Sequence, residues 1–128
     1  MNIKIEVSCG ELIDKLTILR IKEQRITDAA KLANVRLELG SLEEAWRNAV
    51  QDESLVSQLV LDLQVINERL WEIEDQLRER EATKRFDGDF LELARQVYIT
   101  NDQRARIKRE INVKLGSDFV EEKHYNRY

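Results

Sequence analysis

Polar side chains recur at helical spacing along "ITNDQRARIKREIN", residues 99–112, whose apolar residues predict a helix. Ile107 and Ile111 continue an apolar stripe from Leu93 and Val97, and a second stripe beside it carries amides and cations. A guanidinium can bind a carboxylate or phosphate through two parallel hydrogen bonds, and an amide can fix the orientation of the ligand. The second stripe is therefore a candidate anion-binding site, which consists of Asn101, Arg104, Lys108 and Asn112, with Asp102 beside them.

A further polar stripe accompanies the leucines of the helix predicted over residues 54–84. In "NERLWEIED" an indole stands between an amide and two carboxylates, at spacings that place most of them on one helical face. Such a stripe could form one wall of a polar pocket, and the last helix could form another wall. Its members are Asn67, Trp71, Glu74, Asp75 and Arg78, and Glu11, Asp14 and Lys15 near the start of the first helix could accompany them.

The same residues allow a structural interpretation, which the sequence favours because charged flanks are common on bundle helices. Arg104 and Lys108 could pair with carboxylates of facing helices, and a buried ionic network of this kind would fix the helix register. Glu74 and Arg78 have the spacing of an exposed ion pair, which is worth only a few tenths of a kcal/mol. Burial would separate the two interpretations, and the sequence does not state burial. The carboxylates of facing helices that could pair with Arg104 and Lys108 are those of Glu74, Asp75 and Asp14.

Several familiar catalytic and metal-binding patterns do not occur in the sequence. His124 is the only histidine and Cys9 is the only cysteine, so no metal-ligand cluster and no spaced nucleophile–base pair can be recognised. There is also no glycine-rich phosphate loop. We therefore expect no catalytic residues, no metal and no cofactor.

The overall charge and hydropathy limit the partners and the location. The chain of 128 residues has 25 acidic and 21 basic residues, a net charge of −4, which argues against a nucleic-acid partner. No run of about 18 apolar residues is present, so no membrane span is expected. The start lacks the apolar core of a secretory signal, and a lone cysteine is compatible with a reducing compartment. These features predict a cytoplasmic protein.

Long helices must position the polar stripes, because the sequence has no proline and only four glycines. The predicted fold is all-α, a single domain over residues 1–128 that forms an elongated antiparallel bundle. Ser8 is expected to cap the first helix, Asp87 or Asp89 the last, and Gly116 should end it. The expected parts are an extended arm at 1–8, three long helical segments at 10–50, 54–84 and 88–115, and a polar tail at 116–128. The first segment could be kinked or broken near Thr27–Asp28 or near Gly40–Ser41.

The N-terminal arm has the alternating pattern of a β-strand. Ile3, Ile5 and Val7 point one way, and Lys4 and Glu6 point the other. A single strand needs a partner, so the arm must lie on the helices or pair with a second copy. Three long helices also leave one side of a bundle thinly covered, and a homodimer would cover it.

Four motifs, "GELIDKLTILRIK", "NERLWEIED", "LARQVYITNDQRARIKREIN" and "GSDFVEEKHY", resemble an uncharacterised bacterial family, the domain-of-unknown-function family six-one-six-five. The resemblance covers nearly the whole chain and implies an association with polysaccharide and glycosyltransferase genes. It supplies no catalytic residues, and His124 stands where the family motif has serine, so a required histidine is not expected. The matching residues are Glu11, Asp14, Lys15, Asn67, Trp71, Glu74, Asp75, Asn101, Asp102, Arg104, Lys108, Arg109, Asn112, Glu121, Glu122, Lys123 and Tyr125.

Two functional hypotheses follow from these observations. The first is a helical interaction or accessory module that forms a homodimer, with a glycosyltransferase as a possible further partner. The alternative is a small helical enzyme or binder in which Arg104, Lys108 and Arg78 hold an anionic metabolite, such as a sugar phosphate or a dicarboxylate. "LIDKLTILRIKEQRI" is faintly similar to the first helix of helical chorismate mutases, which would be one form of this alternative.

Overall fold

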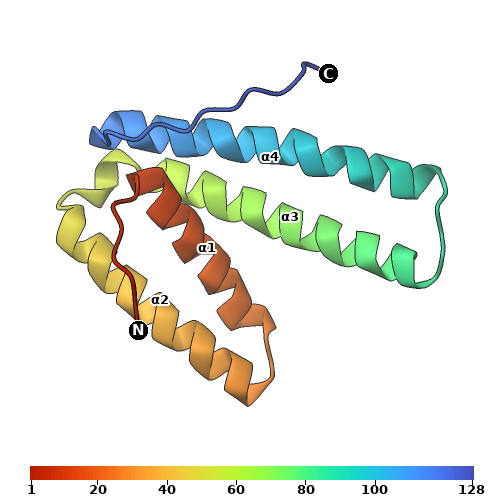
Figure 1. Cartoon of the computed structure of the whole chain (residues 1–128), viewed down its shortest axis with the longest axis horizontal. Helices are drawn as coiled ribbons and strands as arrows, with labels where there is room; N and C mark the ends of the chain where they lie inside the picture. Colours follow the sequence, from red (N-terminus) through yellow and green to blue (C-terminus); the bar gives the residue numbers. More distant parts are fainter.

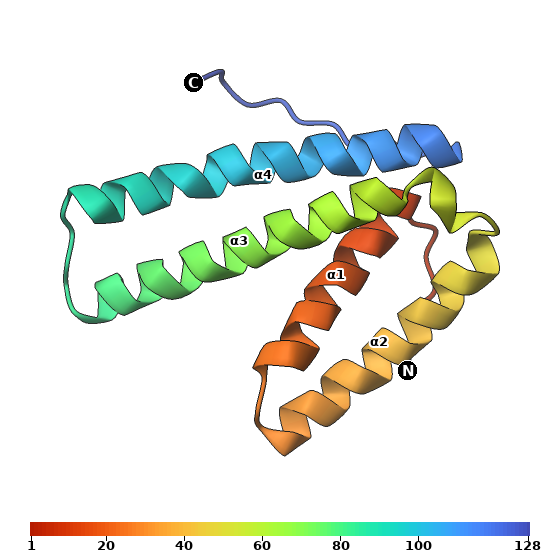
Figure 2. The ribbon, with the colours of Figure 1, turned by 180° about the vertical axis from the view of Figure 1, so that it is seen from behind.

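The computed structural model describes residues 1–128, and it confirms the prediction of an all-α fold. It contains α1 (Cys9–Arg25), α2 (Ala29–Ala49), α3 (Ser57–Ala82) and α4 (Gly88–Leu115), with a short 3₁₀ turn, η1 (Glu53–Leu55), before α3. Figure 1 shows two antiparallel helical hairpins, α1–α2 and α3–α4, which diverge from the end where α1 begins and α4 ends. The view from behind in Figure 2 shows the same V-shaped arrangement. None of the helices is long and apolar enough to cross a membrane.

The first predicted segment, residues 10–50, is a hairpin and not one long arm. The chain leaves the helix at Ile26 (φ −79°, ψ 129°), and Asp28 starts α2 by accepting a hydrogen bond from the Lys31 backbone N–H at 2.9 Å. The break therefore lies at the first of the two expected positions, whereas Gly40 lies inside α2. The reversal is favourable because α1 and α2 each carry an apolar stripe that a single straight helix would leave exposed.

The main core lies where the two hairpins meet. Residues from all four helices and from the turn before α3 contribute to it, and four of them are fully buried, at 0% exposure. Contacts of α1 with α2, α3 and α4 place the first helix at the centre of the packing. The core residues are Ile13, Leu16, Leu19, Val35, Leu39, Trp46, Val56, Val60, Leu63 and Ile111.

The predicted helix ends are confirmed at both termini of α4 and at the start of α1. Ser8 Oγ accepts from the Glu11 N–H, and Asp87 Oδ1 accepts from the Phe90 N–H, each at 3.1 Å. Gly116 ends α4 in the left-handed region at φ 68°, which favours glycine. These local signals could be read directly from the sequence because a cap involves residues only three or four positions apart.

The two ends of the chain leave the helical body in different ways. Residues 1–8 do not form a strand, and Figure 1 shows them running from the start of α1 alongside α2. The C-terminal tail turns back along α4 (Figures 1 and 2), where the Arg109 guanidinium donates to the Glu121 carbonyl at 3.0 Å.

Candidate functional site

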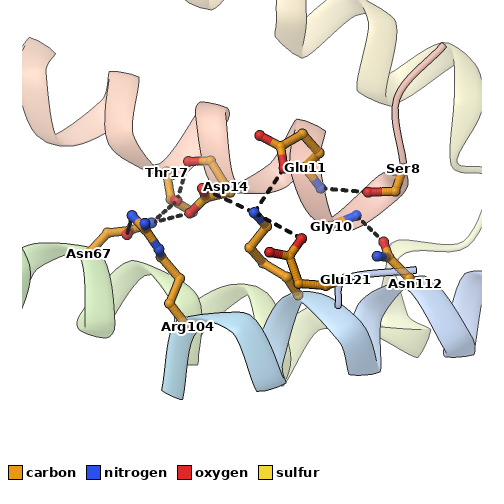
Figure 3. A network of polar contacts seen from close by, with 10 residues as sticks. Ser8, Gly10, Glu11, Asp14, Thr17, Asn67, Arg104, Asn112 and Glu121 are labelled. Atoms are coloured by element: carbon orange, nitrogen blue, oxygen red, sulfur yellow. Dashed lines mark hydrogen bonds and ion pairs between the residues drawn. The ribbon is translucent and has the colours of Figure 1, made fainter. Parts of the chain in front are cut away.

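Lys108 lies in a buried polar layer between α1 and α4. Its Nζ is 2.8 Å from Glu11 Oε2, 3.4 Å from Glu121 Oε2 and 3.8 Å from Asp14 Oδ2. Figure 3 shows these carboxylates converging from α1 and from the tail. Burial opposes the charge of Lys108, but the Glu11 hydrogen bond and the three negative charges outweigh it and raise its pKa. The Lys108 charge is therefore already compensated inside the protein.

Asn112 holds the start of α1 against α4. Its Oδ1 accepts the Gly10 backbone N–H at 2.6 Å, and the neighbouring Cys9 N–H donates to Ser117 Oγ at 3.0 Å. A Cβ at Gly10 would lie 2.5 Å from the Lys108 carbonyl oxygen, so only glycine allows this close approach. Asn112 and Ser117 thus satisfy N–H groups that a free helix start would leave unpaired.

Asn67 connects α3 to α1 through two hydrogen bonds. Its Nδ2 donates to Asp14 Oδ1 at 2.9 Å and to Thr17 Oγ1 at 2.8 Å, and the side chains are almost completely buried. The Thr17 hydroxyl in turn donates to the Asp14 carbonyl at 2.8 Å. The amide oxygen of Asn67 faces α4, where it accepts a long hydrogen bond of 3.5 Å from the Arg104 guanidinium (Figure 3).

A cleft of about 400 Å³ begins beside this layer, between α3 and α4, with Ile18 of α1 as part of its wall. Residues from both predicted polar stripes line it, so the tertiary structure brings the two stripes together at this point. Apolar contributions come from Ile18 and Leu70. The candidate residues that line the cleft are Asn67, Trp71, Glu74, Asp75, Arg78, Asn101 and Arg104.

Arg104 is the cation of the cleft that no carboxylate neutralises. Its guanidinium is half-buried and has one hydrogen bond, a long one of 3.5 Å to Asn67 Oδ1. By contrast, the Arg78 guanidinium lies 3.7 Å from Glu74 Oε2 and is largely exposed. Asn101 Oδ1 is buried without a hydrogen-bond partner. The cleft wall thus includes a guanidinium that has no carboxylate partner and an asparagine whose amide oxygen is buried without a hydrogen-bond partner.

Trp71 forms an aromatic part of the cleft wall, and a second arginine orients it. The Arg25 guanidinium carbon lies 5.8 Å from the centroid of the indole, within the range of a cation–π contact. Arg25 also pairs with Glu72 one position further along α3. The indole is therefore held between α1 and α3 on the flank of the cleft.

The remaining candidate residues lie outside the cleft. Asp102 faces the tail, where its carboxylate is 3.9 Å from Lys123 Nζ, and a hydrogen bond to Asp102 raises the pKa of Tyr128. Lys15 pairs with Glu38 of α2 at 3.4 Å on the surface. The last-helix stripe is thus divided along its length. Its first two residues, Asn101 and Arg104, line a cleft, and its last two, Lys108 and Asn112, are buried between α1 and α4. Glu11, Asp14, Lys108 and Asn112 all belong to the buried layer.

Sequence reasoning did not select several residues that shape this region. Gly10 was a recognisable signal, because a glycine in the first turn of a helix can mark a close backbone approach. Thr17, Arg25 and Ser117 carry no comparable signal, since their roles depend on partners far away in the sequence. No group of three or more His, Cys, Asp or Glu side chains is placed to hold a metal ion.

The comparisons with known proteins agree with the motif resemblance. Residues 3–128 match DUF6165, a family of unknown function. No curated protein and no solved structure matches the chain. Because the match extends over almost the whole length, the protein belongs to the DUF6165 family.

Proposed function

We propose that the chain is a helical ligand-binding and accessory module whose α3–α4 cleft holds a hydroxylated ligand with a single carboxylate or phosphate group. The observation that carries this proposal is that Arg104, at the wall of a cleft of about 400 Å³, has one long hydrogen bond to Asn67 and no carboxylate partner. Partial burial of the Arg104 guanidinium without a carboxylate partner leaves its desolvation cost uncompensated. An anionic ligand group would compensate it through two parallel hydrogen bonds.

The charge of the cleft favours a ligand with one anionic group over a ligand with two separate anionic groups. Glu74 and Asp75 balance Arg78 and Arg104, so the lining residues are neutral in sum. Lys108, the third cation that a ligand with two separate anionic groups would need, is neutralised by three carboxylates outside the cleft. This arrangement weighs against a chorismate-mutase-like site.

The other lining groups suit the remainder of a sugar-like ligand. The carboxylate oxygens of Glu74 and Asp75 can accept hydrogen bonds from hydroxyl groups. Trp71 offers an apolar ring edge or face against which a flat, partly apolar surface can pack. An acidic sugar or a sugar phosphate combines the required anionic group, hydroxyl groups and ring.

Isothermal titration calorimetry with sugar phosphates, uronic acids and matching neutral sugars tests the proposal. We expect binding of the anionic members and a loss of affinity of about tenfold or more in Arg104→Ala, since hydrogen bonds to charged groups contribute about 1.5–3 kcal/mol. Arg104→Lys should retain part of the affinity, because it keeps the charge but not the bidentate geometry.

Arg106→Ala is the matched control, because Arg106 lies on the same helix and lines a different hollow, of about 540 Å³, beneath the tail. Loss of binding in Arg106→Ala with full binding in Arg104→Ala would move the ligand to the tail and overturn the proposal. Equal affinity for the neutral sugars would overturn the role of the anionic group. An accessory role in cell-surface polysaccharide synthesis would fit a ligand of this class, and affinity capture of a glycosyltransferase tests that extension.

We also infer that the chain forms a homodimer, because the N-terminal arm exposes apolar side chains that a second copy could cover. Ile3 and Ile5 are 81% and 76% exposed, although their alternating pattern is that of a half-buried strand. Sedimentation equilibrium of the wild-type chain tests this inference, and a monomer at high concentration would contradict it.

A further inference from the structure

The N-terminal arm, residues 1–8, is an apolar and hydrogen-bonding surface that the rest of the chain does not use. The side chains of Ile3, Ile5 and Val7 are 81%, 76% and 44% exposed. The backbone of residues 2–7 takes part in no backbone hydrogen bond, and the first such bond after it involves the Ser8 carbonyl at the start of α1. Extended backbone with free N–H and C=O groups is a template for pairing with another strand.

We propose that the arms of two copies pair as antiparallel strands, with the two-fold axis passing through Ile5. This proposal rests on the inferred homodimer and specifies how it forms. In this register Ile5 lies opposite Ile5 of the other copy, and Ile3 lies opposite Val7. Directly opposite residues of an antiparallel pair share a face, so the apolar side chains of both arms gather on one side of the ribbon.

The charged residues of the arm select this register. With the axis at Ile5, Lys4 of each copy lies opposite Glu6 of the other, which gives two attractive cross-strand pairs. An axis at Lys4 would put two lysines opposite each other, and an axis at Glu6 would do the same with two glutamates. If one arm shifted along the other by one residue, Lys4 would lie opposite Ile5, and apolar side chains of one arm would share a face with charged side chains of the other. A two-fold symmetric contact joins the same segment of both copies, so that segment must be complementary to itself about the axis, as the arm is about Ile5.

Charge-reversal variants test the register by sedimentation equilibrium. Lys4→Glu and Glu6→Lys should each weaken the dimer by about tenfold or more, since both cross-strand pairs become repulsive. The double variant Lys4→Glu/Glu6→Lys should restore the dimer. An equimolar mixture of the two single variants should form a heterodimer as strong as the wild-type dimer, because every opposed pair is again of opposite charge.

Controls separate this proposal from general effects of charge and folding. Lys84→Glu and Glu81→Lys make the same charge changes at exposed positions near the α3–α4 turn, far from the arm in both views, and should leave the dimer unchanged. Deletion of residues 2–7 should give a monomer with full helical circular dichroism, because no helix includes these residues.

Each result has one meaning. A wild-type chain that stays monomeric would overturn the homodimer and this proposal, but not ligand binding at the cleft. A dimer that withstands both single charge reversals would overturn the register. A dimer that withstands deletion of residues 2–7 would retain the homodimer and overturn pairing through the arms. A dimer that the single variants weaken, and that neither the double variant nor the mixture restores, would overturn the register.

Discussion

Replacing Lys108 by methionine should lower the free energy of unfolding by about 3 kcal/mol. Methionine keeps the length and the apolar stem of the side chain but removes the ammonium group, which lies among three carboxylates. The Lys108 side chain as a whole is 9% exposed. Removing one partner of a buried ion pair costs about 3–5 kcal/mol. We expect the lower end because Glu11 is 44% exposed and can be solvated, whereas Asp14, at 8%, retains a hydrogen bond from Asn67.

Urea denaturation followed by far-ultraviolet circular dichroism measures this difference. Lys15→Met is the control, since the Lys15–Glu38 pair is about half exposed and should contribute less than about 1 kcal/mol. A loss in Lys108→Met no larger than that in Lys15→Met would refute the reasoning.

The same ion pairs predict how the wild-type chain responds to alkaline pH. The pKa of Lys108 is raised in the folded state, so its stabilising contribution is complete below the unfolded pKa of about 10.4. That contribution is lost as the pH rises through the higher folded pKa. Lys108→Arg stays charged in this range and should lose less stability than the wild type between neutral and strongly alkaline pH. Identical alkaline profiles of the two proteins would contradict this assignment.

Two further substitutions test the buried layer. Gly10→Ala should destabilise the protein by about 1–3 kcal/mol, because the added Cβ would lie 2.5 Å from a backbone oxygen of α4. Gly40→Ala is the control, because a Cβ at Gly40 meets open space inside a helix, and it should be neutral or stabilising by up to about 1 kcal/mol. Equal changes in the free energy of unfolding for Gly10→Ala and Gly40→Ala, measured by urea denaturation, would contradict the close approach at Gly10. Asn67→Ala should cost about 2–3 kcal/mol, because it leaves two buried groups of α1 without their hydrogen-bond donor. A cost below about 0.5 kcal/mol in thermal or urea unfolding would contradict that role.

The sequence by itself determined the helical class, the start of α1, both ends of α4 and the two polar stripes. Caps such as Ser8 and Asp87 act over three residues, and the stripes follow from the helical period alone, so neither depends on how helices pack. The family could also be identified, because its motifs extend along the whole chain.

Only the tertiary structure decided which polar residues meet one another and which are buried. The reversal at residues 26–28 folds α2 back on α1 and leaves α1 in contact with α3 and α4. That contact buries Lys108 and Asn112 against the start of α1, whereas Arg104, one turn earlier on the same stripe, borders the cleft. A helical period defines a face of a helix but not what that face contacts, since the contact depends on where neighbouring helices cross and diverge.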